Sequence, residues 1–263
     1  TTTTTTTTTS IHQHTIDPAL ALPLLQTSEW GLWSQNGEDG VLLWIFSELE
    51  MLDGTVAPRY YVEFGVEDGY ECNTRILREQ FHWNGLLMDG SNENSTLNLQ
   101  KEFITAEDIN SLFDKHRVPV DIDFLSVDID FNDFWVLKSV LDLGKYNPKV
   151  IAVEFNSHIP PSEARTVKYN ATQMWDGFSH FSGASAAAFD QLGAAKGYRL
   201  IYCESHGVNC FLVREDLVSD SPDGSSRPTV FDIHRPPNFF GKGLNYPEGV
   251  GEWVWPFSRR EEL

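Results

Sequence analysis

The sequence predicts a single α/β domain built on a doubly wound, mostly parallel seven-stranded sheet that ends in an antiparallel hairpin. Short apolar runs that suit strands alternate with segments of helical spacing, which is typical of a parallel sheet covered on both faces. The last two runs, residues 199–204 and 208–213, are separated by a turn around Gly207. That turn is too short for a parallel crossover, so these two strands must pair antiparallel.

Length and composition agree with one large domain. The chain has 263 residues, of which 41% are hydrophobic and 13% aromatic. It can therefore form a hydrophobic core, and general disorder is excluded. We expect a threonine-rich tail and lead-in segment over residues 1–29 and the α/β domain over 30–219. A lid-like insert is expected over 157–183, because loops of this length in compact domains are usually functional or disordered. Residues 220–263 read as an irregular extension that packs on the domain or on a partner, where it can support a homo-oligomer.

The charge of the chain limits its partners. The 38 acidic and 19 basic residues give a net charge of −19, which argues against nucleic acid because phosphate binding needs a basic surface. A neutral or cationic small molecule fits better, although acidity also serves plain solubility. No apolar run approaches the ~18 residues of a membrane span.

Cysteine usage and short motifs leave the compartment open. Cys203 and Cys210 either pair across the predicted hairpin or, together with Cys72, are small buried side chains in a reduced compartment. The last four residues, REEL, resemble an ER-retrieval signal, and Asn94 and Asn170 begin glycosylation sequons. Both the cytoplasm and the secretory pathway remain compatible with these features.

The first predicted strand, residues 60–64, carries the most informative segment. It stops at Gly65, a second glycine follows at Gly69, and a helical pattern begins at Cys72 and runs to residue 81. Glu63 lies inside the strand, where a carboxylate is costly to bury unless it is hydrogen-bonded or meets a ligand. This position points to a functional role for Glu63.

A polar loop precedes that strand. The apolar residues of 41–49 have helical spacing, so residues 34–40 are predicted to form a polar loop that leads into a helix. The free backbone amides at the start of a helix can bind an anion or a carboxylate. Capping by Glu38 or Asp39 is the alternative interpretation. Capping explains Gln35 less well.

The remaining parallel strands end in acidic or amide side chains. We expect strands at 85–90, 103–105, 123–130 and 149–154, with helices at 105–113, 136–143 and 185–196 between or after them. The candidate site residues at or after these strand ends are the polar residues Asp89, Asp108, Asp128, Asp130, Glu154 and Asn156, together with Gly90. The carboxyl ends of parallel strands share one edge, which is where ligands bind in such sheets. Asp89 follows Gly69 by twenty residues, close to the spacing of the ribose-binding acid in nucleoside-binding folds.

These motifs resemble those of class I S-adenosylmethionine-dependent methyltransferases. The pattern Glu63-x-Gly65-x-x-x-Gly69 resembles the first motif of that superfamily, and Asp89 resembles its ribose-binding acid. Within the superfamily, the run FLSVDIDFNDFWVLK at residues 124–138 is similar to a segment of FkbM-type methyltransferases. The resemblance covers residues 34–217.

The resemblance implies a cofactor site for S-adenosyl-L-methionine formed by Gln35, Glu63, Gly65, Gly69, Asp89, Gly90, Asp108 and Asp128. Glu63 would lie near the ammonium group of the cofactor and Asp108 near its adenine. Asp128 would follow the strand that faces the transferred methyl group. The chain departs from the FkbM pattern at Phe131, where glycine is usual, so we expect this ring to narrow or reshape the acceptor pocket.

Methyl transfer needs alignment of the reactants, and it needs a base when the acceptor is a hydroxyl. The candidate catalytic residues are Asp128, Asp130 and His158, with Glu154 as a further candidate base. His158 precedes two prolines, so a plain loop histidine is the alternative for it. Capping of the next helix is the alternative for Asp130 and its polar neighbours.

A divalent metal is a second option on the acceptor side. Asp128, Glu154 and Asn156 offer oxygen ligands that suit Mg²⁺ or Ca²⁺, and metal-dependent catechol-type methyltransferases are similar in this respect. We therefore expect an O-methyltransferase that acts on a small molecule or a carbohydrate hydroxyl. The alternative is a catalytically inactive methyltransferase-like domain that serves as a structural or assembly subunit.

Overall fold

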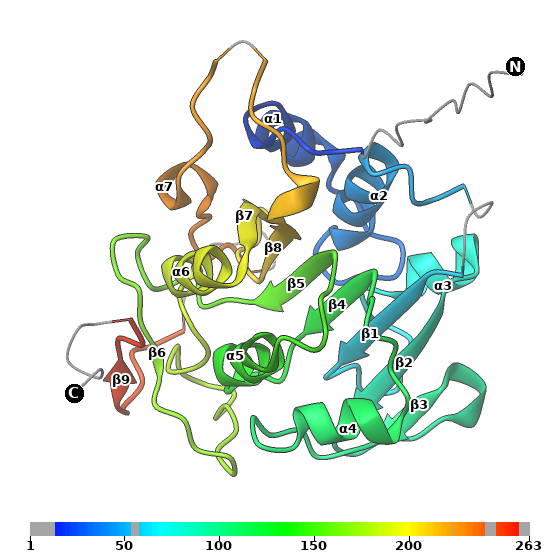
Figure 1. Ribbon diagram of the computed structural model, residues 1–263. Helices are drawn as coiled ribbons and strands as arrows, with labels where there is room; N and C mark the ends of the chain where they lie inside the picture. The colour runs from blue at the N-terminus through cyan, green and yellow to red at the C-terminus, as the bar shows by residue number, and fades with distance from the viewer. Residues whose placement is uncertain (1–13, 54–57, 223, 240–245, 258–263) are drawn as a thin grey trace, which may run out of the picture.

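The computed structural model describes residues 14–53, 58–222, 224–239 and 246–257, and the threonine-rich tract and the REEL terminus lie outside these ranges. A central sheet has the strand order β3-β2-β1-β4-β5-β8-β7 (Figure 1). Its strands are β1 (Tyr60–Phe64), β2 (Asn84–Asp89), β3 (Leu99–Lys101), β4 (Phe124–Val127), β5 (Val150–Glu154), β7 (Tyr198–Cys203) and β8 (Asn209–Arg214). The first five are parallel, and β8 is antiparallel to both of its neighbours, β5 and β7. The predicted fold class is confirmed.

Helices cover both faces of the sheet, as Figure 1 shows. One face carries α1 (Pro18–Ser28), α2 (Glu38–Glu48) and α3 (Arg75–Phe81), and the other carries α4 (Ile109–Lys115), α5 (Asp133–Leu143), α6 (Ala186–Lys196) and α7 (Val230–Ile233). Strand side chains alternate between the two cores. In β1, for example, Val62 and Phe64 pack on the α5 side and Tyr61 on the α2 side. The central strands are therefore mainly apolar because both of their faces are buried.

The third strand lies earlier than the sequence predicts. We expected it at residues 103–105, but β3 spans Leu99–Lys101 and Phe103 is 57% exposed. Asn98 adopts a left-handed conformation with φ of 53°, and Asn94 forms a bridge with Leu99. This tight turn buries Leu99 beside Leu87 of β2, so the strand forms at the turn and not at the later apolar run.

Two helix starts also differ from the prediction. Helix α2 begins at Glu38, because acidic residues stabilise the first turn of a helix and extend it toward the amino terminus. Helix α3 begins at Arg75 and not at Cys72, because the backbone amides of Asn73 and Thr74 are bound to Glu63. None of the helices in the described ranges has the length and hydropathy needed to cross a bilayer.

The insert and the extension meet outside the main sheet. Strand β6 (Thr166–Val167) of the insert pairs antiparallel with β9 (Trp253–Val254) of the extension. Phe131 is 1% exposed and packs beneath them against Phe181, with 5.8 Å between ring centroids, and Phe181 packs against Trp253 at 4.9 Å. Phe131 therefore anchors the insert.

A disulfide closes the predicted hairpin. Cys203 of β7 and Cys210 of β8 lie directly opposite each other and are bonded, while Cys72 is free and buried. Of the two sequence interpretations, pairing is the one observed.

Reduction of this disulfide is expected to lower the free energy of unfolding by roughly 2 kcal/mol, because the bond closes a short loop in the unfolded chain. Urea unfolding with and without dithiothreitol measures the effect. The double variant Cys203→Ala/Cys210→Ala is the control and should not respond to the reductant. An oxidised wild type whose midpoint equals that of the reduced form would show that the two thiols are not linked in solution.

Candidate functional site

A cavity of about 570 Å³ lies at the carboxyl edge of the parallel strands. Its walls come from the ends of β1, β2, β4 and β5, from the loop before α2, from the insert, from the β7–β8 turn and from the extension. Within the described part of the chain its lining contains no lysine or arginine. It contains nine carboxylate side chains, those of Glu38, Glu63, Glu67, Asp68, Glu71, Asp89, Asp128, Asp130 and Glu154.

The glycine turn after β1 is required by close packing. Gly65 has φ of 76°, and a Cβ placed there would lie 1.6 Å from the carbonyl oxygen of Asp128. The end of β1 thus runs directly against the end of β4, at a distance that only glycine allows. Gly69 also has positive φ, at 78°, and it packs against Leu87 and Leu97 without lining the cavity.

Glu63 organises the loop between β1 and α3. Its buried carboxylate accepts hydrogen bonds from the backbone amides of Asn73 and Thr74, both at 2.8 Å, and from the Thr74 hydroxyl at 2.6 Å. Burial raises the pKa of Glu63, and these hydrogen bonds oppose the shift. The residue lines the cavity. Its contact with a cofactor ammonium group stays a prediction.

Asp89 joins the loop after β2 to the glycine turn. One of its oxygens accepts hydrogen bonds from the amides of Ser91 and Asn92, at 2.7 and 2.9 Å, and from the Asn92 side chain at 3.0 Å. Among the described residues, the other accepts only from the Glu67 amide, at 3.0 Å. Because a carboxylate oxygen has two lone-pair sites, the second oxygen can still accept a hydrogen bond from a ligand hydroxyl.

Besides Gly69, two further predicted cofactor residues do not line the cavity. Gly90 has no atoms within 4 Å of a Cβ built on it and is absent from the lining. Asp108 precedes α4, where its carboxylate bonds to the Thr105 hydroxyl at 3.1 Å. The sequence placed Asp108 at a strand end, but the strand before it ends at Lys101, several residues earlier.

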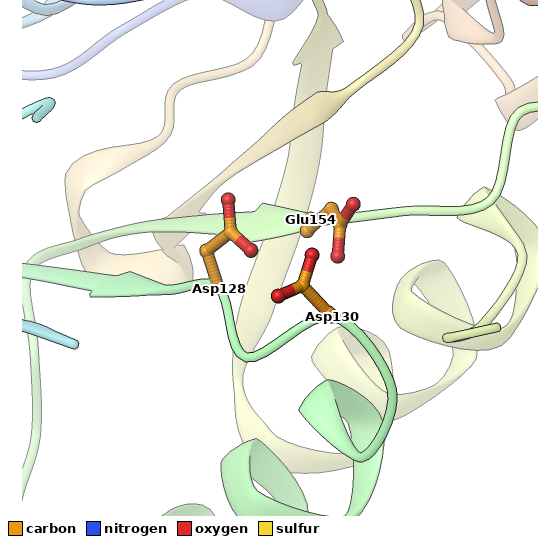
Figure 2. Close-up of side chains that lie close together, drawn as sticks. All are labelled: Asp128, Asp130 and Glu154. Carbon is orange, nitrogen blue, oxygen red and sulfur yellow. The ribbon is translucent and has the colours of Figure 1, made fainter. Parts of the chain in front are cut away.

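Three carboxylates converge on the floor of the cavity. Oxygen atoms of Asp128, Asp130 and Glu154 lie within 4.8 Å of one another, and we call these residues the acid triad (Figure 2). They come from the end of β4, from the turn into α5 and from the end of β5. Asp130 has φ of 65°, a conformation that is uncommon for a residue other than glycine and that is often found at functional sites.

The carboxylates of the triad repel one another and are partly removed from solvent. Desolvation, together with repulsion from neighbouring carboxylates, raises the pKa of Asp128 and of Glu154 well above the usual range. Below the triad, Asp133 is fully buried at the start of α5 and accepts a hydrogen bond from the Ile129 amide at 2.7 Å. Burial raises its pKa to about 7. A cation placed at the triad would relieve this repulsion.

The predicted metal set of Asp128, Glu154 and Asn156 stays a prediction. The donor chemistry of the triad fits a hard divalent cation, and the side chain of Asn156 also bonds to the insert. Its amide nitrogen donates to the carbonyl oxygens of His180 and Ser182, at 2.6 and 2.8 Å, and its side-chain oxygen accepts from the His158 amide at 3.1 Å. Asn156 thus fixes the insert to the end of β5, and Asp130 lies beside Asp128 and Glu154.

His158 lies in a group of rings on the side of the cavity formed by the insert and the extension. It stacks on His180 with 5.1 Å between centroids and an angle of 16° between planes, and it contacts Phe239 at 5.7 Å. Tyr246 packs edge-on against Trp175 at 5.1 Å. All five rings line the cavity, and we call them the aromatic wall. Burial and the neighbouring His180 lower the pKa of His158 to about 4, so its ring is neutral at pH 7.

Two buried acidic residues, Glu38 and Asp39, stabilise the opposite side of the cavity. Glu38 is fully buried and accepts from the Asn209 side chain and from the Asn36 amide, both at 2.8 Å. Burial and the charge of Glu204 raise its pKa. Asp39 accepts from the amides of the preceding loop, so both acids organise that loop. Neither caps α2, whose N-cap is Gly37 with no side-chain cap hydrogen bond. Gln35 lies exposed on the loop and lines the cavity.

Comparisons with known proteins bear on the fold alone. No protein family and no curated protein matches the chain in sequence. Among solved structures, it is similar to an O-methyltransferase family protein from Burkholderia thailandensis, with 10% identity over 70% of this chain and 60% of that one, and a TM-score of 0.37. It is also similar to the CMeT domain of the citrinin polyketide synthase, with 10% identity over 70% and 52% of the two chains, and a TM-score of 0.40. The chain thus spans less than two thirds of each of these structures.

The sequence located the strand-end acids but missed the two rings of the aromatic wall that the extension supplies. Phe239 and Tyr246 lie in the extension, which has no helical or strand periodicity, and they reach the cavity only through tertiary packing. The one available signal was the aromatic content of the insert and extension. Phe131, expected to reshape the pocket, does not line the cavity.

Proposed function

We propose that this protein is an S-adenosylmethionine-dependent methyltransferase. The observation that carries the proposal is a cavity at the carboxyl edge of the sheet that combines the Gly65 turn, Asp89 and the acid triad and is lined by no lysine or arginine among the described residues. The cofactor carries a sulfonium and an ammonium charge, both of which an acidic cavity favours. The run at residues 124–138 supports the FkbM type among these enzymes.

Particular residues suit the parts of the cofactor. The free lone pair of Asp89 suits ribose hydroxyls, and the backbone of the Gly65 turn borders the space beside it. Glu63 and Gln35 border the same cavity. When bound, the cofactor supplies a methyl group on a positively charged sulfur. The contribution of this chain is to align the acceptor, exclude water and take up a proton.

For a hydroxyl acceptor, Asp128 and His158 are the proposed proton acceptors, with Asp130 beside them. A raised pKa brings Asp128 closer to the working pH, which is the condition for efficient general-base catalysis. His158 is neutral at pH 7, and its Nε2 has no partner among the described residues, so it can accept a hydrogen bond or a proton. Its lowered pKa makes it a weaker base than Asp128. Mg²⁺ or Ca²⁺ is a second candidate occupant of the acid triad.

No observation in the described residues favours the alternative of an inactive structural subunit. That alternative predicts a cavity filled by Phe131 or by the extension. Phe131 packs under the insert, and the extension contributes Phe239 and Tyr246 to the walls of the cavity.

Calorimetry with S-adenosylhomocysteine tests the proposal. We expect wild type to bind and Asp89→Ala to bind about tenfold more weakly or worse, because it loses an acceptor for the ribose hydroxyls. Asp108→Ala is the matched control, since it removes an exposed aspartate outside the cavity, and it should bind like wild type. The urea midpoint of each variant separates loss of binding from loss of folding. A folded wild type that does not bind would contradict the proposal.

A further inference from the structure

We infer that the acceptor is a small molecule with an organic ammonium group, held between the acid triad and the aromatic wall. This inference rests on the proposed function and narrows its substrate class. The charge of the cavity is the first support. Its lining has nine carboxylates and, among the described residues, no lysine or arginine to neutralise them. An anionic acceptor would be repelled, and a neutral one would leave the triad uncompensated.

The aromatic wall is the second, independent observation. Cations are attracted to the faces of aromatic rings, and groups of rings are the common means of recognising ammonium groups with attached carbon. Aromatic rings do not favour a bare divalent ion, because such an ion requires oxygen ligands and water. Trp175, Tyr246 and Phe239 come from two separate segments and line the same cavity as the triad.

The triad and the wall are close enough to act on one molecule. Glu154 belongs to the triad and His158 to the wall, and every residue between them lines the cavity. Four residues of fully extended chain span at most about 14 Å, so a small molecule can touch both.

Unpartnered polar atoms on this side of the cavity point to a ligand. Ser157 is 3% exposed and lines the cavity, and its hydroxyl has no hydrogen-bond partner among the described residues. Nε2 of His158 and Nδ1 of His180 also lack a hydrogen-bond partner among the described residues, and both histidines line the cavity. A buried hydroxyl without a partner is unfavourable, and a polar acceptor molecule would satisfy it.

Calorimetric titration with choline tests the inference, and 3,3-dimethylbutan-1-ol serves as the neutral analogue of the same shape. Both are titrated into the full chain with and without S-adenosylhomocysteine. We expect choline to bind at least about tenfold more tightly than the alcohol. Equal affinity of the two, or no binding of choline, would overturn the inference.

Variants of the wall add a second test. Tyr246→Leu should weaken choline binding about tenfold, whereas Tyr246→Phe keeps the ring and should bind nearly as wild type. Trp255→Leu is the control, because Trp255 is 46% exposed and does not line the cavity. An equal effect of Tyr246→Leu and Trp255→Leu would contradict a role for the wall.

Magnesium chloride distinguishes the rival occupant. The inference fails if three results are found together: Mg²⁺ binds to wild type, Asp130→Asn does not bind Mg²⁺, and choline does not bind. The triad is then a metal site. Binding of S-adenosylhomocysteine without choline would overturn this inference alone. Binding of choline without S-adenosylhomocysteine would leave a cation site and overturn the proposed function.

Discussion

Replacing Glu154 by glutamine is expected to make the unliganded protein more stable at pH 8, by about 1–3 kcal/mol. Glutamine keeps the shape of the side chain and removes one of three converging negative charges. A gain of this size raises the thermal midpoint by about 2–4 °C per kcal/mol in a chain of this length. The same change should weaken the binding of choline or Mg²⁺. The negative charge that destabilises the unliganded protein is also the charge that attracts the cation.

The pH dependence of stability follows from the same carboxylates. A carboxyl whose pKa is raised on folding binds protons more tightly in the folded state, so stability falls as the pH rises through the folded pKa. This applies to Asp128 and Glu154, and to Asp133, whose pKa is raised to about 7. The lowered pKa values of His158 and His234 act in the opposite sense, but only below about pH 6.5, where the unfolded histidines gain protons.

We therefore expect the urea midpoint of wild type to fall between pH 6.5 and pH 8, and to fall less in Glu154→Gln. The raised pKa of His206 contributes a decline of the same sign in both proteins. Glu102→Gln is a control of opposite sign. Its partners Lys115 and His116 lower the pKa of Glu102, so its loss should destabilise the protein at pH 8. Parallel pH profiles for wild type and Glu154→Gln would contradict this account of the triad.

Substitution of Gly65 by alanine should produce the largest loss of stability, about 3–5 kcal/mol. The added Cβ would lie 1.6 Å from the Asp128 carbonyl oxygen, and φ of 76° is unfavourable for alanine. Since the clash is with backbone, no side-chain rotation relieves it. The strands β1 and β4 would have to separate, which would also displace Asp128 from the triad.

Gly144→Ala isolates the effect of the clash. Gly144 has φ of 64° at the end of α5 and nothing within 4 Å of a Cβ, so alanine there meets only backbone strain of about 1 kcal/mol. Urea unfolding of the two variants measures the difference. If Gly65→Ala is as stable as Gly144→Ala, the close approach of β1 and β4 does not exist in solution.

The sequence predicts the central sheet well because its strands are buried on both faces. Continuous apolar runs in β1, β4 and β5 have no competing interpretation, and the short β7–β8 turn determines its own pairing. The position of β3 depends on a turn at Asn98, and β6 pairs with β9 from far along the chain. Neither feature leaves a periodic pattern, since both depend on tertiary contacts.

The site follows the same division. Parallel topology alone brings Asp128, Asp130 and Glu154 to one edge, so their meeting could be predicted without contacts. Asn156 has the right type and place for a metal ligand, and only its bonds to the insert reveal another role. The aromatic wall joins segments that are distant in the sequence, beyond the reach of local patterns.

The pairing of β6 with β9 has a consequence for how the cavity can be altered. Two chain segments that are about ninety residues apart are joined into one ribbon, with Trp253 packed on Phe181. A proteolytic nick in the exposed stretch around Met174 would leave both fragments attached, so a cut chain would still migrate as one species on a native gel. Lengthening either segment would shift the other, so the position of the insert depends on two distant stretches of the sequence.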